Sequence, residues 1–181
     1  YMKQDYLFLI EFSKVISLAI AKSKNLDDMS WFATLLNETL NTEMALHVSF
    51  CQDFNIEEKD LLVTKMSPAT HAYTRHLLEI GYSGSTPEIA TAILPCSWGY
   101  SEIGKRLFEK GVPQNNPLYS RWIQMYNSDE FEELALFIRK FIDREAETMT
   151  TANQETLKDI FFTSTRYEYN FWHSAYTLET W

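Results

Sequence analysis

The sequence predicts an all-α protein, a single-domain helical bundle that spans residues 1–181. Composition is the first reason: 45% of the residues are hydrophobic and 15% aromatic, whereas glycine and proline number only five each, which favours long helices over a turn-rich β fold. Length is the second, because 181 residues suit one domain with one sizeable hydrophobic core. The third is that helix-capping residues precede apolar stretches along most of the chain.

Seven helices are expected, with no repeat or linker among them. With their caps they cover residues 1–23, 28–54, 67–81, 86–111, 116–126, 128–148 and 151 to near the C-terminus. Asp28 is the expected cap of the second helix, and a cap followed by proline begins each of the next three. Ser128 or Asp129 begins the sixth, and Thr151 with Gln154 has capping-box spacing at the seventh. The first helix has no start signal, so we expect that an N-terminal piece is absent.

Polar side chains lie on the apolar faces of several expected helices. In steps of three or four residues, Asp5 falls on the inner face of the first helix and Glu168 on that of the last. The same steps place Cys96 and Tyr100 one turn apart on the inner face of the fourth. Because burying an unpaired carboxylate costs several kcal/mol, such groups pair internally or line a cavity that holds something polar. Polar positions on separate helices therefore predict a pocket. On the second helix the inner face is expected to hold Leu36, Leu40, Glu43, His47, Phe50 and Phe54.

The two cysteines are too few and too isolated for a disulfide framework or a zinc site, so reduced thiols are expected. Cys51 is expected in the core, where it acts as a small hydrophobe. Cys96 differs, because Pro95 removes one backbone hydrogen bond from the helix and bends the chain where the thiol lies. A buried thiol needs a carboxylate or phenol network to manage its proton, which the other inward-facing polar residues would supply if the bundle brings those faces together.

The charge and hydropathy patterns exclude two classes of partner. The formal net charge is −9, from 16 basic and 25 acidic residues, and no basic run offsets it, so nucleic acid is not an expected partner. No apolar stretch reaches the roughly 18 to 20 residues needed to span a bilayer, and no signal peptide opens the chain. We therefore expect a cytoplasmic protein with no membrane association.

Five segments together carry a specific resemblance to a known family. They are QDYLFL at 4–9, EMALH at 43–47, AYTRHL at 72–77, LPCSWGYSEIG at 94–104 and YEYNFWHSAY at 167–176. In this order and spacing, over nearly the whole chain, the sequence resembles the TenA family, also called thiaminase II. The resemblance implies a haem-oxygenase-like helical bundle that holds no haem and assembles as a homotetramer. The family's opening helix and the loop after it have no counterpart here.

The resemblance also implies an enzyme of thiamin salvage. Members hydrolyse 4-amino-5-aminomethyl-2-methylpyrimidine to its hydroxymethyl form, with release of ammonia, and cleave thiamin more slowly. Cys96 matches the nucleophile that adds to the pyrimidine ring, Glu168 the acid that serves the ring, and Asp5 the residue that grips its amino and nitrogen edge. With a cysteine at position 96, the chain resembles the cysteine-containing branch. The implied partner is a small-molecule pyrimidine, and no metal or other cofactor is implied.

Further positions match the family's binding residues. Tyr100 and Tyr126 match substrate-binding phenols, and Tyr73 matches another pocket aromatic. Phe8 is a departure, because many members have a tyrosine there that is thought to assist the thiol, and phenylalanine donates no hydrogen bond.

Other interpretations of the same residues stay open. A carboxylate-bridged metal oxidase on this type of bundle would use the oxygen and nitrogen donors of Asp5, Glu43, His47 and Glu168. Glu43 and His47, four residues apart on one helix, also fit a structural pair. A non-catalytic regulatory protein would bind the pyrimidine and release no ammonia.

Overall fold

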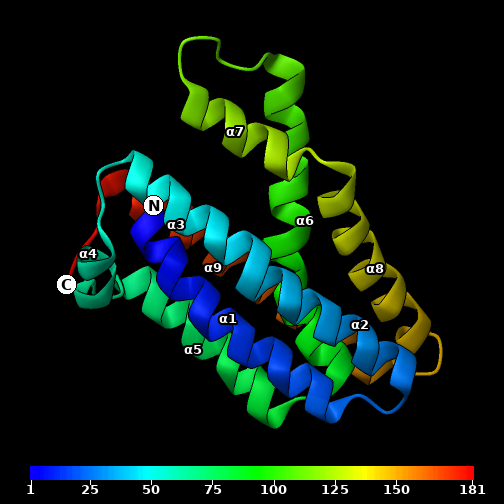
Figure 1. The fold of residues 1–181 in the computed structure, drawn as a ribbon. Helices are drawn as coiled ribbons and strands as arrows, with labels where there is room; N and C mark the ends of the chain where they lie inside the picture. Colours follow the sequence, from blue (N-terminus) through cyan, green and yellow to red (C-terminus); the bar gives the residue numbers. More distant parts are fainter. The chain divides into compact units, whose positions relative to one another are not determined.

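The computed structural model describes residues 1–181 and is all-helical, as the sequence predicts (Figure 1). Helices contain 83% of the residues, and there is no strand. The elements are, in order, α1 (Met2–Lys22), α2 (Leu26–Asn37), the π-helical segment η1 (Glu38–Glu43), α3 (Met44–Asp53), α4 (Glu58–Val63), α5 (Pro68–Ser83), α6 (Thr86–Lys110), α7 (Pro117–Tyr126), α8 (Asp129–Ala146) and α9 (Thr151–Thr177). None of these helices is both long and apolar enough to cross a membrane.

The chain forms two compact units. Unit 1 consists of Tyr1–Ile89 and Arg166–Trp181, and unit 2 consists of Ala90–Thr165. The boundaries lie inside α6 and α9, so each of these two helices contributes residues to both units. The single-domain organisation stays a prediction.

Helix α1 is the centre of unit 1. It lies between α5 on one side and α2 with α3 on the other (Figure 1). The inward position predicted for Asp5 on α1 is confirmed, since Asp5 is buried, together with Phe8 and Val15 of the same helix. Helix α5 comes close to α1 at Gly81, where a Cβ atom would lie only 2.9 Å from Cδ1 of Leu18. The helix that carries the buried Asp5 is therefore closely packed against α5 at this point.

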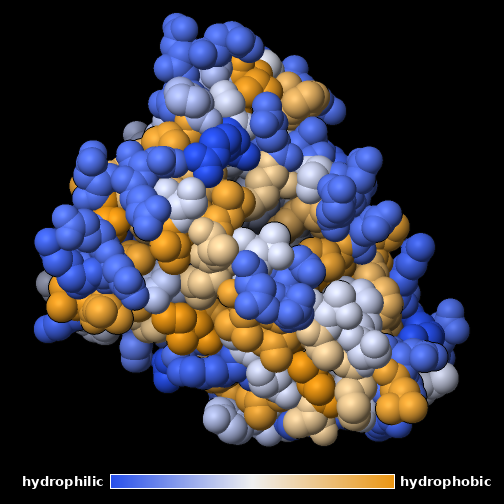
Figure 2. All heavy atoms as spheres, in the orientation of Figure 1, coloured by the Kyte–Doolittle hydropathy of each residue, from blue (hydrophilic) through white to orange (hydrophobic).

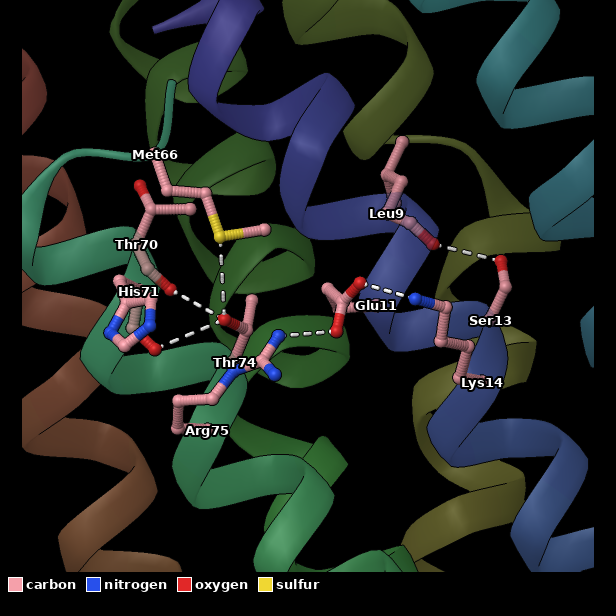
Figure 3. Close-up of polar contacts among 9 residues, drawn as sticks. All are labelled: Leu9, Glu11, Ser13, Lys14, Met66, Thr70, His71, Thr74 and Arg75. Carbon is pink, nitrogen blue, oxygen red and sulfur yellow. Dashed lines mark hydrogen bonds and ion pairs between the residues drawn. The ribbon is translucent and has the colours of Figure 1, made fainter. Parts of the chain in front are cut away.

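An ion-pair cluster also joins α1 to α5 (Figure 3). The buried carboxylate of Glu11 accepts hydrogen bonds from Arg75 on α5 and from Lys14 on its own helix, each at 2.5 Å. On α5, the hydroxyl of Thr74 donates to the carbonyl oxygen of Thr70 at 2.9 Å. The two cations compensate the cost of burying Glu11, which an unpaired carboxylate would impose in full.

Three predicted caps are wrong by one to three residues. At α6 the predicted cap Thr86 is already helical, and Ser85 precedes the helix, with its backbone N–H donating to the side chain of Glu88 at 2.7 Å. Helix α2 begins at Leu26, and Asn25 caps it by accepting a hydrogen bond from the backbone N–H of Asp28 at 2.9 Å. At α9 the hydroxyl of Thr150, not Thr151, accepts from a first-turn backbone N–H, at 3.3 Å. At each of these helix starts several capping residue types are neighbours in the sequence, and the sequence alone does not show which one the chain uses. The caps Ser67, Asn116 and Ser128 are confirmed.

Helix α4 is not predicted, because its first three residues belong to the polar stretch at 55–60, which reads as a connection. Its start is stabilised by Asp60, whose side chain accepts a hydrogen bond from the backbone N–H of Glu57 at 2.9 Å. Leu61 anchors the helix in the core, whereas Leu62 and Val63 are 74% and 77% exposed. Figure 2 shows apolar atoms beside strongly hydrophilic ones where α4 lies.

The π-helical segment η1 interrupts the second expected helix. Thr39 in its first turn and His47 after its end are both buried, at 2% and 0% exposure. In an uninterrupted α-helix, eight residues turn about 80° beyond two full turns, which would point the two side chains in different directions. The wider turn of a π-helix accommodates the extra residue and returns His47 to the buried side. The predicted inner face is therefore wrong for Leu40 and Phe54, which are each 46% exposed.

Unit 2 contains most of α6, together with α7, α8 and the first part of α9. Helix α6 passes Gly104 directly against the end of α7, where a Cβ atom would lie 2.5 Å from the carbonyl carbon of Tyr126. No side chain larger than hydrogen fits at that contact without movement of the backbone. Gly104 thus fixes the position of Tyr126 relative to α6.

Candidate active site

The sequence-predicted site residues fall in both units. Asp5, Phe8, Tyr73 and Glu168 belong to unit 1, and Cys96, Tyr100 and Tyr126 belong to unit 2. The residues of each unit are described in turn below. The meeting of Cys96 with Asp5 and Glu168 stays a prediction.

In unit 1, Asp5 pairs with His47. Nε2 of His47 lies 2.5 Å from Oδ2 of Asp5, which links the start of α1 to α3. Nδ1 of the same ring lies 2.9 Å from the carbonyl oxygen of Glu43, the last residue of η1. The histidine therefore contacts the backbone of Glu43, one turn before it as the structural-pair interpretation has it, and in addition pairs with the side chain of Asp5.

The charge of the Asp5–His47 pair follows from its surroundings. Burial alone lowers the pKa of His47, but the charge of Asp5, the hydrogen bond to it and the charge of Glu43 together raise this pKa from 6.5 to about 9. The imidazole is therefore protonated at neutral pH. The two side chains form a buried ion pair, with His47 at 0% and Asp5 at 4% exposure.

Glu168, on α9, is the second buried carboxyl of unit 1. Burial raises the pKa of Glu168 from 4.5 to about 8. Hydrogen bonding from Tyr73 and Trp172 lowers this pKa in part, whereas the nearby charge of Asp5 adds to the increase. Glu168 is therefore a neutral carboxylic acid at pH 7 and is able to donate a proton.

Aromatic rings enclose these acids within unit 1. The ring of Tyr73 stacks parallel to that of Tyr167 at a centroid distance of 5.8 Å, and Phe8 packs against Tyr73 at 5.0 Å. Tyr1 stacks on Trp172 at 5.1 Å. Aromatic faces of this kind can stack on a flat heteroaromatic ring and keep bulk water away from it.

In unit 2, Cys96 lies on α6 and is half-buried, and it forms no disulfide. Pro95 stands within this helix and has no N–H to donate to the preceding turn, as predicted. The expectation that Cys51 is a core residue is confirmed, since it is 1% exposed and burial raises the pKa of its thiol. Of the two thiols, Cys96 is therefore the one that a ligand can reach.

The two predicted phenols of unit 2 share one aromatic cluster. The rings of Tyr100 on α6 and Tyr126 on α7 are 4.8 Å apart, and both side chains are buried. Trp122 packs on Tyr126 at 4.5 Å and Phe131 meets it edge-on at 4.9 Å. The sequence reasoning predicted the two tyrosines and missed Trp122 and Phe131, although Trp122 stands one turn before Tyr126 on the same helix.

Sequence reasoning did not find the Asp5–His47 pair, because its partners are 42 residues apart and the π-helical segment sets the direction of His47. The pair also bears on the metal-oxidase alternative. Both ring nitrogens of His47 already contact oxygen atoms, and neither unit contains three or more His, Cys, Asp or Glu side chains arranged to hold a metal ion. The donors proposed for that alternative therefore do not form a metal-binding group.

Comparisons with known proteins give a consistent result. The profile of the TENA/THI-4/PQQC family matches residues 1–178. An aminopyrimidine aminohydrolase from Halalkalibacterium halodurans is 39% identical over 183 residues, which span 100% of this chain and 81% of that protein. One from Bacillus subtilis is 36% identical over 182 residues, or 100% of this chain and 76% of the relative. The crystal structure of a TenA family transcription regulator from a Silicibacter species superposes with a TM-score of 0.87 at 33% identity, covering 96% of this chain and 78% of that one.

Proposed function

Because the chain belongs to the TENA/THI-4/PQQC family, we propose that it is a hydrolase of thiamin-derived 4-aminopyrimidines. Its fold is the all-α, haem-oxygenase-like fold of that family. The observation that carries the proposal is the state of the two acids in unit 1: Glu168 is protonated at neutral pH, and Asp5 is paired with the cationic His47. A 4-aminopyrimidine needs this combination, a proton donor for a ring nitrogen and an acceptor for the amino group.

The proposed reaction exchanges ammonia for water on the exocyclic methylene of 4-amino-5-aminomethyl-2-methylpyrimidine. The sulfur of Cys96 adds to an electron-poor ring carbon, while Glu168 gives its proton to the ring nitrogen on which charge develops. The electron-rich ring then expels ammonia from the methylene group, whose amine leaves in its protonated form as NH3, and water adds in its place with the loss of one proton. The ring nitrogen finally returns its proton, and the carbon–sulfur bond breaks to release the hydroxymethyl product.

The other predicted residues have binding roles in this proposal. Asp5 accepts a hydrogen bond from the 4-amino group, and Tyr73 and Phe8 supply aromatic surface in unit 1. Tyr100 and Tyr126 bind the substrate from unit 2. Thiamin is a slower substrate in this scheme, with its thiazole as the leaving group. A homotetramer in the cytoplasm is part of the proposal, supported by the family resemblance, and light scattering of the purified protein tests the assembly.

An ammonia-release assay tests the function. We expect the wild-type chain to release ammonia from 4-amino-5-aminomethyl-2-methylpyrimidine and to cleave thiamin more slowly. Replacement Cys96→Ala should lower kcat by at least about a hundredfold, because it removes the nucleophile. The matched control is Cys51→Ala, which removes the other thiol of the chain and should keep the wild-type rate.

Two outcomes would contradict the proposal. A Cys96→Ala protein that releases ammonia at the wild-type rate would show that Cys96 is not the nucleophile. Tight binding of the pyrimidine with no ammonia released would instead favour a regulatory protein, the class named for the Silicibacter structure. Calorimetric titration of the pyrimidine beside the assay separates these two outcomes.

A further inference from the structure

We propose that His47 is a positioning residue, which holds one oxygen of the Asp5 carboxylate and leaves the second oxygen to accept a hydrogen bond from the 4-amino group of the substrate. The inference rests on the proposed function, in which Asp5 binds the amino edge of the pyrimidine. It adds a residue that contacts no substrate and acts only through Asp5. Sequence reasoning gave His47 a structural or a metal-binding role instead.

The hydrogen-bond partners of His47 define its protonation. The carbonyl oxygen of Glu43, 2.9 Å from Nδ1, can only accept a hydrogen bond, so Nδ1 carries a proton. Nε2 lies 2.5 Å from Oδ2 of Asp5, and an ionised carboxylate also only accepts. Together these two contacts describe an imidazolium with both N–H groups used. The ring cannot rotate without losing one of the two bonds.

Charged groups around the pair support the same state. His47 experiences the negative charges of Asp5 and Glu43, which raise its pKa to about 9 against the effect of burial. The charge of Asp5 in turn raises the pKa of Glu168. It also raises the pKa of the Cys51 thiol, with a smaller effect than burial, Lys3 and the N-terminal ammonium group. His47 is the cation hydrogen-bonded to the Asp5 carboxylate, with 0% exposure. Solvent therefore provides little screening between them.

The Asp5–His47 pair allows the site to distinguish a 4-aminopyrimidine from a 4-oxopyrimidine. One oxygen of Asp5 is committed to His47, and its second oxygen can receive an N–H group, while protonated Glu168 donates to a ring nitrogen. A 4-aminopyrimidine presents an amino donor to Asp5. A 4-oxopyrimidine presents a carbonyl oxygen there, so that two acceptors face each other and binding weakens. His47 contributes to this discrimination because it keeps Asp5 an acceptor.

Kinetics of the variant His47→Gln test the proposal. Glutamine is neutral and keeps a donor group, so the charge is the main change. We expect kcat/KM for the aminopyrimidine to fall about tenfold to a hundredfold at pH 7.5, the range for a lost charge-assisted hydrogen bond, chiefly through a higher KM. The preference for the 4-amino over the 4-oxo ligand in binding titrations should shrink.

The matched control is His173→Gln, which changes an exposed histidine of the same unit and should leave these constants unchanged. A His47→Gln enzyme with the wild-type KM and the wild-type preference for the 4-amino ligand would overturn the proposal. If the wild-type chain releases no ammonia, the proposed function fails first, and the dissociation constants of the 4-amino and 4-oxo ligands then test His47 alone.

Nuclear magnetic resonance of the imidazole nitrogens gives a readout that needs neither activity nor a ligand. At pH 7.5 we expect the His47 signal of a doubly protonated ring, and we expect this signal to be lost in Asp5→Asn, which removes the negative charge. A neutral His47 ring in the wild-type protein would overturn the proposal. This measurement stays valid if His47→Gln fails to fold.

Discussion

At the scale of the residue, unit 1 gives two carboxyl groups opposite states. Glu168 has no cation beside it, so burial dominates and raises its pKa to about 8. Asp5 is buried as deeply but contacts the protonated ring of His47 at 2.5 Å. One acid is thereby suited to donate a proton and the other to accept a hydrogen bond. The cation beside Asp5 is His47, whereas burial is the main cause of the raised pKa of Glu168.

The pH dependence of turnover should report Glu168. Because its pKa is about 8, kcat/KM should be constant below this pH and fall about tenfold per pH unit above it, as the proton donor is lost. Glu168→Gln should lower kcat by about a hundredfold to ten-thousandfold and abolish this alkaline decrease. An alkaline decrease that persists unchanged in Glu168→Gln would assign the titration to another group.

At this scale the sequence predicted which residues face inward and missed which residues they meet. Helical periodicity alone places Asp5, Tyr100 and Glu168 on inner faces, and all three are buried. The partner of Asp5 was not predictable, because the hydrogen bond to His47 depends on how two helices pack and not on the spacing along either. The pKa values depend on burial in three dimensions and were equally out of reach.

At the scale of the element, the prediction of helix starts succeeded where the sequence signals for a helix start were unambiguous. A cap followed by proline located the starts of α5 and α7 correctly, because proline fixes the backbone angle of the first turn. Short helices and π-helical turns lack such signals. Helix α4 has only six residues, and η1 has the composition of an ordinary helix, so tertiary packing decides both.

The contact between α6 and α7 makes a sharp prediction for Gly104→Ala. The added methyl carbon would lie 2.5 Å from the backbone of Tyr126, so α7 must move, and we expect a loss of about 1 to 3 kcal/mol in the free energy of unfolding. The KM for the aminopyrimidine should rise as well, because Tyr126 is displaced. Urea denaturation and steady-state kinetics measure the two effects.

Gly99→Ala is the matched control on the same helix. No atom lies within 4 Å of a Cβ at Gly99, and alanine favours a helix by up to about 1 kcal/mol over glycine, so this variant should be at least as stable as the wild type. Equal stability losses in both variants would show that the close approach at Gly104 is not the cause.

At the scale of the whole molecule, the two buried titrating groups couple stability to pH. Glu168 binds its proton more tightly in the folded state, with a pKa of about 8 against 4.5, so folding loses stability as the pH rises from 4.5 through 8. His47 also has a raised pKa, about 9 against 6.5, so its contribution is complete below pH 6.5 and is lost as the pH rises through 9. Both effects have the same sign.

We therefore expect the free energy of unfolding to fall between pH 6.5 and 9, by up to about 1.4 kcal/mol per pH unit for each group. Urea denaturation at a series of pH values measures this slope. Glu168→Gln should flatten the curve below pH 8, and His47→Gln should flatten it between 6.5 and 9. A wild-type protein whose stability is constant or increases over this range would contradict both assignments.

The fold class and the family could be predicted for the whole chain, because composition, caps and five motifs all indicate one kind of helical protein. The division into two units could not be predicted from the sequence. It lies inside α6 and α9, and both helices continue without a break through the boundary. Sequence punctuation marks the ends of helices, and a change of packing partner within a continuous helix leaves no such mark.

The wide turn at η1 has a consequence for how this helix can vary between relatives. The chain has one residue more between Thr39 and His47 than a regular α-helix would need, and the π-helical turn accommodates this residue without a loop. A relative with a plain α-helix in this place keeps the histidine opposite its aspartate only if one residue is deleted from the stretch. Insertion and deletion inside a helix, usually excluded, are thus permitted at this one point, and a gap there would preserve the ion pair.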